Sequence, residues 1–251
     1  GGLSIPKMGA TGFAYELAER FGLKIVPPRP ALVPLVLAQE DALFRSLSGV
    51  AAEVIARCGK TQFREAALFT HKGLSGPAIL QISSYWREGE DIHIDFGPDL
   101  EQGWLLQAKR ASPRAQARGA IAAHLPARLA DRLTEILDAA IGLAGQMANM
   151  SDDRLAAAEQ RLAQWRFRPR DSESFAKADG TAGGIDTPEQ SSKTMQARNA
   201  TGRFAIDDTV DVQACLARYT FPWPRTRRWP AAHYAPQHRL RRPHQTRLQR
   251  I

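Results

Sequence analysis

The chain has 251 residues, of which 43% are hydrophobic, with a formal net charge of +8 and a mean hydropathy of −0.35. This length can bury one large core or two small ones. No apolar run approaches the ~20 residues that a membrane span needs. The start of the chain shows no basic region followed by an apolar region, as a signal peptide would. We therefore expect a globular protein without a membrane partner.

The positive charge is confined to one end of the sequence. Residues 212–251 hold nine arginines, no lysine and no acidic residue. The first 211 residues hold 25 basic against 26 acidic residues and are close to neutral. This distribution argues against nucleic acid as the partner of the folded part. A basic arm that binds nucleic acid or an anionic surface is the alternative for the tail itself.

The cysteines and histidines indicate no metal centre. Cys58 and Cys215 stand alone, without C-x-x-C spacing, and His71, His93 and His124 show no zinc-like spacing. Two isolated cysteines are typical of a reducing compartment, so we expect a cytoplasmic location.

The first hundred residues predict a helix and then a small β unit. Phe13, Leu17 and Phe21 share one face of a helix over 12–21 that Gly22 ends. Three prolines within 27–30 mark a boundary. Strands are predicted over residues 32–37, 50–57, 63–69 and 92–96.

The most informative segment is residues 69–77, Phe-Thr-His-Lys-Gly-Leu-Ser-Gly-Pro. It joins a strand to a helix that begins at Pro77, where a missing N–H costs nothing. His71 and Ser75 would lie near the positive end of that helix, which suits an anionic or carbonyl ligand. An ordinary glycine turn fits the spacing as well. His71 is the candidate for acid–base work, and a loop-fixing hydrogen bond beside Gly73 is its alternative role.

The composition from residue 101 onward predicts helices. An amphipathic stripe with helical spacing comprises Leu129, Leu133, Ile136, Leu137 and Ile141. Ser151, followed by two aspartates, is expected to cap a last helix. The inner face of that helix would hold Leu155, Leu162 and Trp165.

Three motifs, in the same order, resemble one protein family. Residues 68–86, with the core F-T-H-x-G-L-S-G-P-A-I-L-Q, are similar to the signature of the bacterial BaiN/RdsA/aminoacetone-oxidase family of FAD-dependent oxidoreductases. Residues 1–12 resemble its T-G-G-L-S-Y-P-x-T-G-S-T-G segment. Residues 181–195 resemble its T-A-G-G-V-D-T…S-S-K-T-M segment.

The resemblance implies a fold and a division into domains. The fold class would be α/β, and α+β for this fragment: a partial glutathione-reductase-like FAD domain, interrupted by a β-barrel-like insert with a helical subdomain. The FAD-binding segments would be 1–27 and 167–212, the barrel-like insert 28–100, the helical subdomain 101–166, and an irregular basic tail 213–251. The sequence contains no G-x-G-x-x-G motif. We therefore interpret the chain as the C-terminal part of a longer protein.

The resemblance also implies which residues contact FAD. Gly1, Gly2 and Ser4 belong to the segment that lines the cofactor cleft. Gly183 and Gly184 would let the backbone pass close to the cofactor, because glycine lacks a Cβ. The family's I-G-E-x-x-D motif corresponds to residues 206–211. Asp208 keeps the position at which related folds accept a ribityl hydroxyl, and Asp211 ends the motif.

Two departures from the family pattern argue against FAD binding by this chain alone. Asp207 and Arg218 replace glycines and add charged side chains beside the cofactor. The resemblance stops after Trp223, which we interpret as a reading-frame shift near that codon.

The expected function is that of an FAD-dependent oxidoreductase. Its partners would be a small-molecule substrate or a nicotinamide nucleotide. The alternatives are a non-catalytic remnant that folds as the insert domain, and a protein that binds nucleic acid or an anionic surface through the basic tail.

Overall fold

The computed structural model describes residues 2–200 and 202–212. The predictions made for Gly1, Cys215, Arg218 and the basic tail lie outside these ranges.

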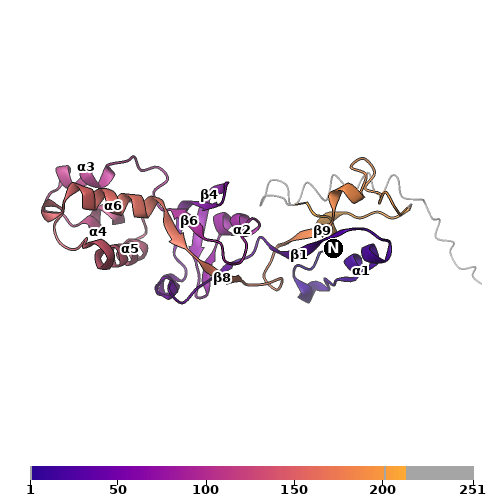
Figure 1. Cartoon of the computed structure of the whole chain (residues 1–251). Coiled ribbons are helices and arrows are strands. Elements are labelled where there is room, and N and C mark those ends of the chain that lie inside the picture. Colours follow the sequence, from indigo (N-terminus) through magenta and orange to yellow (C-terminus); the bar gives the residue numbers. More distant parts are fainter. Residues whose placement is uncertain (1, 201, 213–251) are drawn as a thin grey trace, which may run out of the picture.

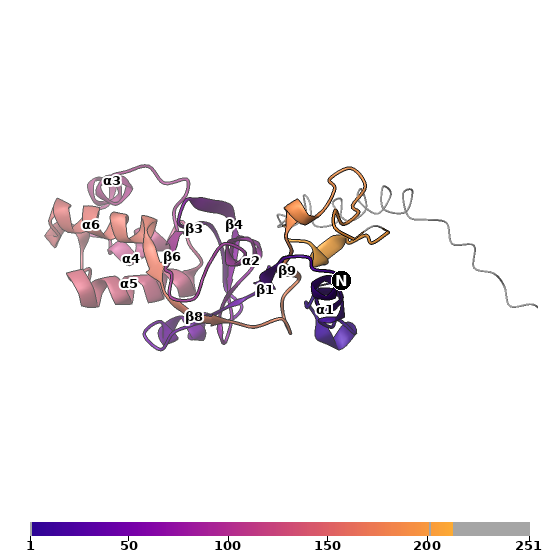
Figure 2. The ribbon, with the colours of Figure 1, turned by 45° about the vertical axis from the view of Figure 1, so that its right-hand side comes forward.

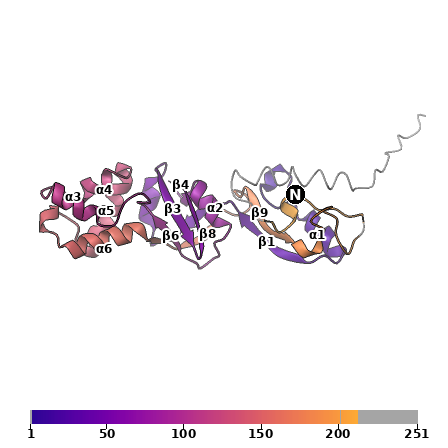
Figure 3. The same cartoon turned by 90° about the horizontal axis from the view of Figure 1, so that it is seen from above.

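The described residues form three parts in a row (Figure 1). A small unit contains α1 (Phe13–Arg20), β1 (Ile25–Ala31) and β9 (Gly180–Ile185). A seven-stranded sheet with α2 (Pro77–Ser83) lies in the middle, and helices α3 to α6 lie at the other end. The same order is visible in the view turned by 45° (Figure 2) and from above (Figure 3).

The central sheet is antiparallel throughout and has the strand order β7-β6-β3-β4-β5-β2-β8. Its strands are β2 (Leu35–Leu37), β3 (Ala51–Cys58), β4 (Thr61–Phe69), β5 (Gly73–Ser75), β6 (Ile92–Asp95), β7 (Trp165–Phe167) and β8 (Pro169–Ser172). The two edge strands, β7 and β8, follow each other in the chain with only Arg168 between them. The sheet must therefore curl until its edges meet, which gives it a barrel-like form.

The helical part comprises α3 (Trp104–Ala111), α4 (Ala117–Ala122), α5 (Ala127–Ile141) and α6 (Asp152–Ala163). The predicted stripe on α5 is confirmed: Leu129, Leu133 and Leu137 are fully buried. The predicted cap of α6 is also confirmed, because Ser151 Oγ accepts a hydrogen bond from the Arg154 amide at 3.2 Å.

The short 3₁₀ turns are η1 (Pro6–Met8), η2 (Ala42–Leu47), η3 (Met147–Asn149), η4 (Thr187–Glu189) and η5 (Asp207–Thr209).

The sheet and helices α3 to α6 share one hydrophobic core, which extends from Leu35 to Phe167. The small unit has a separate core of Ala18, Leu23, Ile185 and Ala197. The two connections between these parts run side by side. The Glu173 amide donates to Pro34 O at 2.9 Å, and the Asp179 amide donates to Leu32 O at 3.1 Å.

Helix α2 fastens these connections to the sheet. Ser83 Oγ accepts from the Val33 amide at 3.0 Å, and Ser84 Oγ accepts from the Leu32 amide at 3.3 Å. Arg29 donates to Ser84 O at 2.5 Å. Because α2 also packs on β3, β4 and β5, it holds the small unit against the barrel.

The mixed α+β class, with antiparallel sheets, is confirmed, while the glutathione-reductase-like arrangement stays a prediction. The predicted strand over 32–37 was wrong in its first half, since β2 begins at Leu35. Three further differences concern β1, β5 and Trp165. β1 runs through the prolines that were interpreted as a boundary, β5 was not predicted, and Trp165 begins β7 rather than ending α6.

β1 tolerates its prolines because it has a partner on one side only. It pairs with β9, and the register shifts between Val26 and Arg29, where Pro27 and Pro28 lie. A proline cannot donate to a ladder, so it is compatible with a two-stranded sheet and with a bulge.

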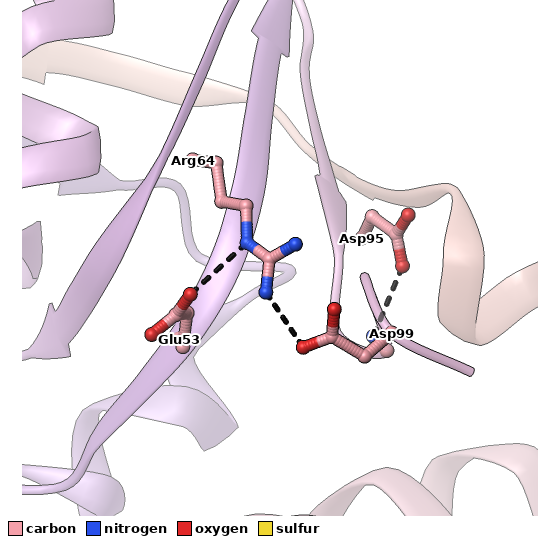
Figure 4. A network of polar contacts seen from close by, with 5 residues as sticks. Glu53, Arg64, Asp95 and Asp99 are labelled. Atoms are coloured by element: carbon pink, nitrogen blue, oxygen red, sulfur yellow. Dashed lines mark hydrogen bonds and ion pairs between the residues drawn. The ribbon is translucent and has the colours of Figure 1, made fainter.

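One face of the central sheet carries a polar network (Figure 4). Arg64 of β4 donates to Glu53 on the neighbouring β3 at 3.0 Å and to Asp99 at 2.6 Å. Asp95, at the end of β6, accepts from the Gly97 amide at 3.0 Å. These groups are solvent-exposed or partly so, and such pairs contribute little to stability. The network marks the outer face of the barrel.

We expect Gly73→Ala to destabilise the barrel. An added Cβ would overlap Leu35 O and lie 2.7 Å from the Leu37 amide nitrogen, and neither backbone atom can move without separating β2 from β5. Overpacking of this kind costs about 1–3 kcal/mol, measurable by urea unfolding. Gly119→Ala in α4 is the control, because nothing lies within 4 Å of its added Cβ. Equal stability of the two variants would contradict this account.

Candidate cofactor-binding site

Segments far apart in the sequence meet beside the β1–β9 pair. Thr181 Oγ1 of β9 accepts a hydrogen bond from the Leu3 amide at 3.1 Å, and it lies 2.9 Å from the Ser4 hydroxyl oxygen. A Cβ at Gly2 would overlap Thr181 Oγ1 and lie 2.7 Å from Asp208 Cβ. The structure thus brings together three of the residues singled out from the sequence, Gly2, Ser4 and Asp208.

Tyr15 of α1 ties the helix to this cluster. Its hydroxyl donates to Asp208 O at 2.8 Å, and the side chain is 6% exposed. Burial, and secondarily the charge of Asp208, raise the pKa of Tyr15 to about 12. The phenol therefore stays protonated at neutral pH and keeps its hydrogen bond.

The glycines of β9 allow backbones to approach one another. Gly183 has φ +83° and Gly184 has φ +120°, both unfavourable for other residues. A Cβ at Gly183 would overlap Pro27 O of β1, and one at Gly184 would lie 2.6 Å from Thr209 O. The packing of β1, β9 and η5 therefore requires glycine here. The contact of these glycines with a cofactor stays a prediction.

Asp211 fixes the end of the same arrangement. Its carboxylate accepts from the Gly183 amide at 3.0 Å, and its own amide donates to Ile185 O at 2.9 Å. Arg29 of β1 is half-buried. Burial and the neighbouring charge of Arg87 lower the pKa of Arg29 to about 10. The negative charge of Asp211 acts in the opposite direction and partly offsets this decrease in the pKa. Asp211 thus orders the chain that carries Asp208.

A cavity of about 480 Å³ opens beside the cluster. Its polar wall includes Gly2, Ser4, Asp179 and Asp208, and its apolar wall includes Ile5, Met8 and Phe13. Met8 is 83% exposed and Phe13 is 65% exposed. Such a cavity suits a ligand with hydroxyl groups at one end and a flat apolar part at the other.

His71 lies outside this cluster. It is exposed in the turn between β4 and β5, and β5 separates it from the start of α2. The segment folds as a hairpin, with Ser75 ending β5 directly before Gly76, the N-cap of α2. The catalytic role of His71 stays a prediction. The turn is held by Thr70, whose Oγ1 accepts from the Lys72 and Gly73 amides at 3.3 and 3.0 Å.

Sequence reasoning missed two residues of the cluster. Thr181 is the hydrogen-bond partner of the first segment, and Tyr15 anchors Asp208. Thr181 opens the T-A-G-G motif, so its place in that motif was an available signal. Tyr15 had no comparable signal, because its partner is a backbone carbonyl.

The remaining reactive groups do not join this site. Cys58 is buried on β3, where burial and the nearby Glu90 raise the pKa of the thiol to about 11. Within the described ranges, no three His, Cys, Asp or Glu side chains are grouped so as to hold a metal ion. Among the same residues, no helix combines the length and the apolarity that a membrane crossing requires.

Comparison with known proteins identifies the family. Residues 29–179 match the model described as "HI0933-like protein barrel and H2TH domain". The chain belongs to the HI0933-like family, within the FAD-dependent oxidoreductases. The sequence-based assignment to the FAD-dependent oxidoreductases is confirmed at this level, while the narrower resemblance to BaiN, RdsA and aminoacetone oxidase stays a prediction.

Three curated relatives match most of the chain. The ribosomal RNA dihydrouridine synthase of Escherichia coli is 40% identical over 242 residues, 92% of this chain and 58% of that protein. The Haemophilus influenzae protein of the same name is 38% identical, over 89% of this chain and 55% of its own length. A 3-dehydro-bile acid delta(4,6)-reductase of Clostridium scindens is 26% identical, over 89% and 57%. The chain therefore spans little more than half the length of these relatives.

We expect Tyr15→Phe to lower the free energy of unfolding by about 1 kcal/mol, because Asp208 O loses its donor. The raised pKa of Tyr15 gives the wild-type protein stability that is present below pH 10 and lost as pH rises towards 12. The variant lacks this contribution, so the difference between the two proteins should shrink in alkali. Urea unfolding at neutral and alkaline pH measures it. A difference that stays constant with pH would contradict the buried environment that raises the pKa, and equal stability of the two proteins at neutral pH would contradict the hydrogen bond to Asp208 O.

Proposed function

We propose that this chain forms part of the flavin site of an FAD-dependent reductase that acts on uridine in ribosomal RNA. Membership in the HI0933-like family supports the flavin. Two relatives named ribosomal RNA dihydrouridine synthase support ribosomal RNA as the substrate, which departs from the sequence-based expectation that nucleic acid is not a partner of the folded part. A third relative is named as a reductase. Because the chain spans little more than half the length of these relatives, reduction of uridine in ribosomal RNA by this chain is a proposal.

The observation that carries the proposal is the convergence of Gly2, Ser4, Thr181 and Asp208 on one cavity. The cavity wall carries the carboxylates of Asp179 and Asp208 and no lysine or arginine among the described residues. Two carboxylates repel phosphate but accept hydrogen bonds from hydroxyl groups. The residues present therefore fit the ribityl and ring portion of FAD, and its pyrophosphate would bind elsewhere.

FAD, when bound, supplies hydride transfer. The residues of this chain position it: the Ser4 hydroxyl and the Asp208 carboxylate can bind ribityl hydroxyls, and the apolar Ile5, Met8 and Phe13 can cover the flat ring. The product name dihydrouridine means that a hydride and a proton are added to a carbon–carbon double bond. We assign no proton donor to the described residues. His71 keeps only its sequence-based candidacy.

The test is a visible absorption spectrum of the full chain after incubation with FAD and desalting. We expect a retained flavin band, which would mean that the charged residues Asp207 and Arg218 do not exclude FAD as the sequence had indicated. Gly2→Ala should lose this band, because the new Cβ pushes the first segment away from Thr181 and Asp208. Gly12→Ala is the matched control, because the nearest atom to its added Cβ is the flexible Glu16 carboxylate at 3.8 Å.

A colourless wild-type protein would contradict the flavin site of this chain and favour a non-catalytic remnant. For the substrate, the flavin-loaded chain is reduced with NADPH and mixed with ribosomal RNA. A mass increase of two hydrogens on uridine is the expected product. A protein whose flavin is reduced but which leaves the RNA unchanged would contradict ribosomal RNA as the substrate, and it would not contradict the flavin site.

A further inference from the structure

A second cavity lies where the sheet meets the helices, and we name it the junction pocket. It has a volume of about 480 Å³ and lies between η2, α5, α6 and β7. Its main lining residues are Asp41, Phe44, Ile136, Arg161, Trp165 and Arg166. None of its lining residues belongs to the cofactor cavity. The family motifs did not point to it.

The junction pocket lies against two aromatic residues of the hydrophobic core, Phe44 and Trp165, which are 2% and 9% exposed. The rings of Phe44 and Trp165 meet edge to face, with centroids 5.8 Å apart. Ile136 of α5 forms one wall, and Leu43 at the rim is 53% exposed. A flat, partly apolar group of the size of a nucleobase can lie against Leu43, Ile136 and the small exposed part of Trp165.

A carboxylate lies beside this apolar floor. Asp41 precedes η2, but its side chain does not cap that turn; the backbone carbonyl of Asp41 accepts from the Phe44 amide at 3.0 Å. Burial raises the pKa of Asp41 to about 6, and the Arg168 amide opposes the shift. The other charged groups that line the pocket are Glu40, Arg161 and Arg166. At neutral pH the pocket therefore holds a partly desolvated carboxylate, which already accepts a hydrogen bond from the Arg168 amide and keeps further lone pairs for a ligand.

Two exposed arginines flank the opening. Arg166 of β7 forms an ion pair with Asp91 at 3.5 Å, while Arg161 of α6 has no ion pair within the described residues. Guanidinium groups at the rim of an apolar pocket suit phosphate oxygens. The two elements η2 and α5, which both contribute lining residues, are joined because Arg128 of α5 donates to Ser46 O of η2 at 2.5 Å.

From this arrangement we propose that the junction pocket binds one unpaired guanine nucleotide, with Asp41 accepting hydrogen bonds from the guanine N1–H and N2–H and with Arg161 and Arg166 contacting the neighbouring phosphates. Guanine fits because it alone among the four RNA bases presents two adjacent N–H donors to one carboxylate. The source is an unpaired stretch of RNA, and this part of the inference rests on the proposed function. The pocket would anchor the RNA at a nucleotide other than the one reduced.

The test uses the full chain and a labelled oligouridylate that carries one central guanosine or, in a matched probe, one inosine. Inosine lacks the N2 amino group, so it removes one of the two donors. Fluorescence anisotropy should show roughly tenfold weaker binding of the inosine probe to the wild-type protein. In Asp41→Asn the two probes should bind equally, because an amide oxygen cannot replace a double acceptor.

Matched variants separate the recognition of guanine from effects on stability and from the nonspecific attraction between charged residues and RNA. Glu65→Gln removes an exposed carboxylate outside the pocket and should keep the preference for guanosine. Arg161→Ala should weaken both probes alike, and more than Arg110→Ala, an exposed arginine of α3 outside the pocket. Asp41→Asn should be at least as stable as the wild type at neutral pH, since burial disfavours the charge that it removes. The guanosine preference of the wild type should fade as the pH drops through about 6.

Equal binding of the two probes by the wild-type protein would overturn the pocket assignment, as would an unchanged preference in Asp41→Asn. Guanosine monophosphate that competes as well as the oligonucleotide would overturn RNA as the source. These results are independent of the flavin test: Gly2→Ala should lose the flavin band and keep the guanosine preference, while Asp41→Asn should do the reverse.

Discussion

The antiparallel pairing of β1 with β9 is the contact on which the rest of the arrangement depends. It joins Ile25 to Ile185 and Ala31 to Gly180, so it brings the beginning and the end of the described chain together. Without it, Thr181 could not meet Ser4, and Asp208 could not approach Gly2. The pair is possible because Gly183 and Gly184 leave room for the backbones of Pro27 and Thr209. The candidate cofactor site therefore depends first on the close packing of these backbones, and then on the chemistry of its side chains.

Prediction from the sequence was accurate for helices, whose hydrophobic pattern repeats over several helical turns. The stripe on α5 and the cap at Ser151 needed only helical spacing and one side-chain oxygen. Strands of three residues, such as β5 and β7, carry too few positions for a period to show. β1 was missed for another reason: its prolines are incompatible with a central strand but not with a strand that has one neighbour.

The candidate site was predictable in part, through motifs rather than through spacing. Gly2, Ser4 and Asp208 came from the family resemblance and do lie together. His71 looked like a site residue because a strand, a glycine and a helix start follow one another. Its neighbour Thr70 instead supplies the hydrogen bonds that close a hairpin. Asp41 gave no signal at all, because much of its environment is built by α6 and β7, which are distant from it in sequence.

The two connections between the small unit and the barrel have a consequence for how this architecture can change. Pro34 and Glu173 are hydrogen-bonded neighbours, as are Leu32 and Asp179, so everything between them leaves and returns at one point. For a segment with adjacent ends, the entropic cost of closing the chain rises only slowly with the length of the segment. The barrel and its helices can therefore be enlarged, shortened or exchanged while β1 and β9 stay paired, provided that the contacts of Ser83 and Ser84 with the first connection are kept. Specificity for a substrate can in this way diverge without disturbing the segments that surround the cofactor cavity.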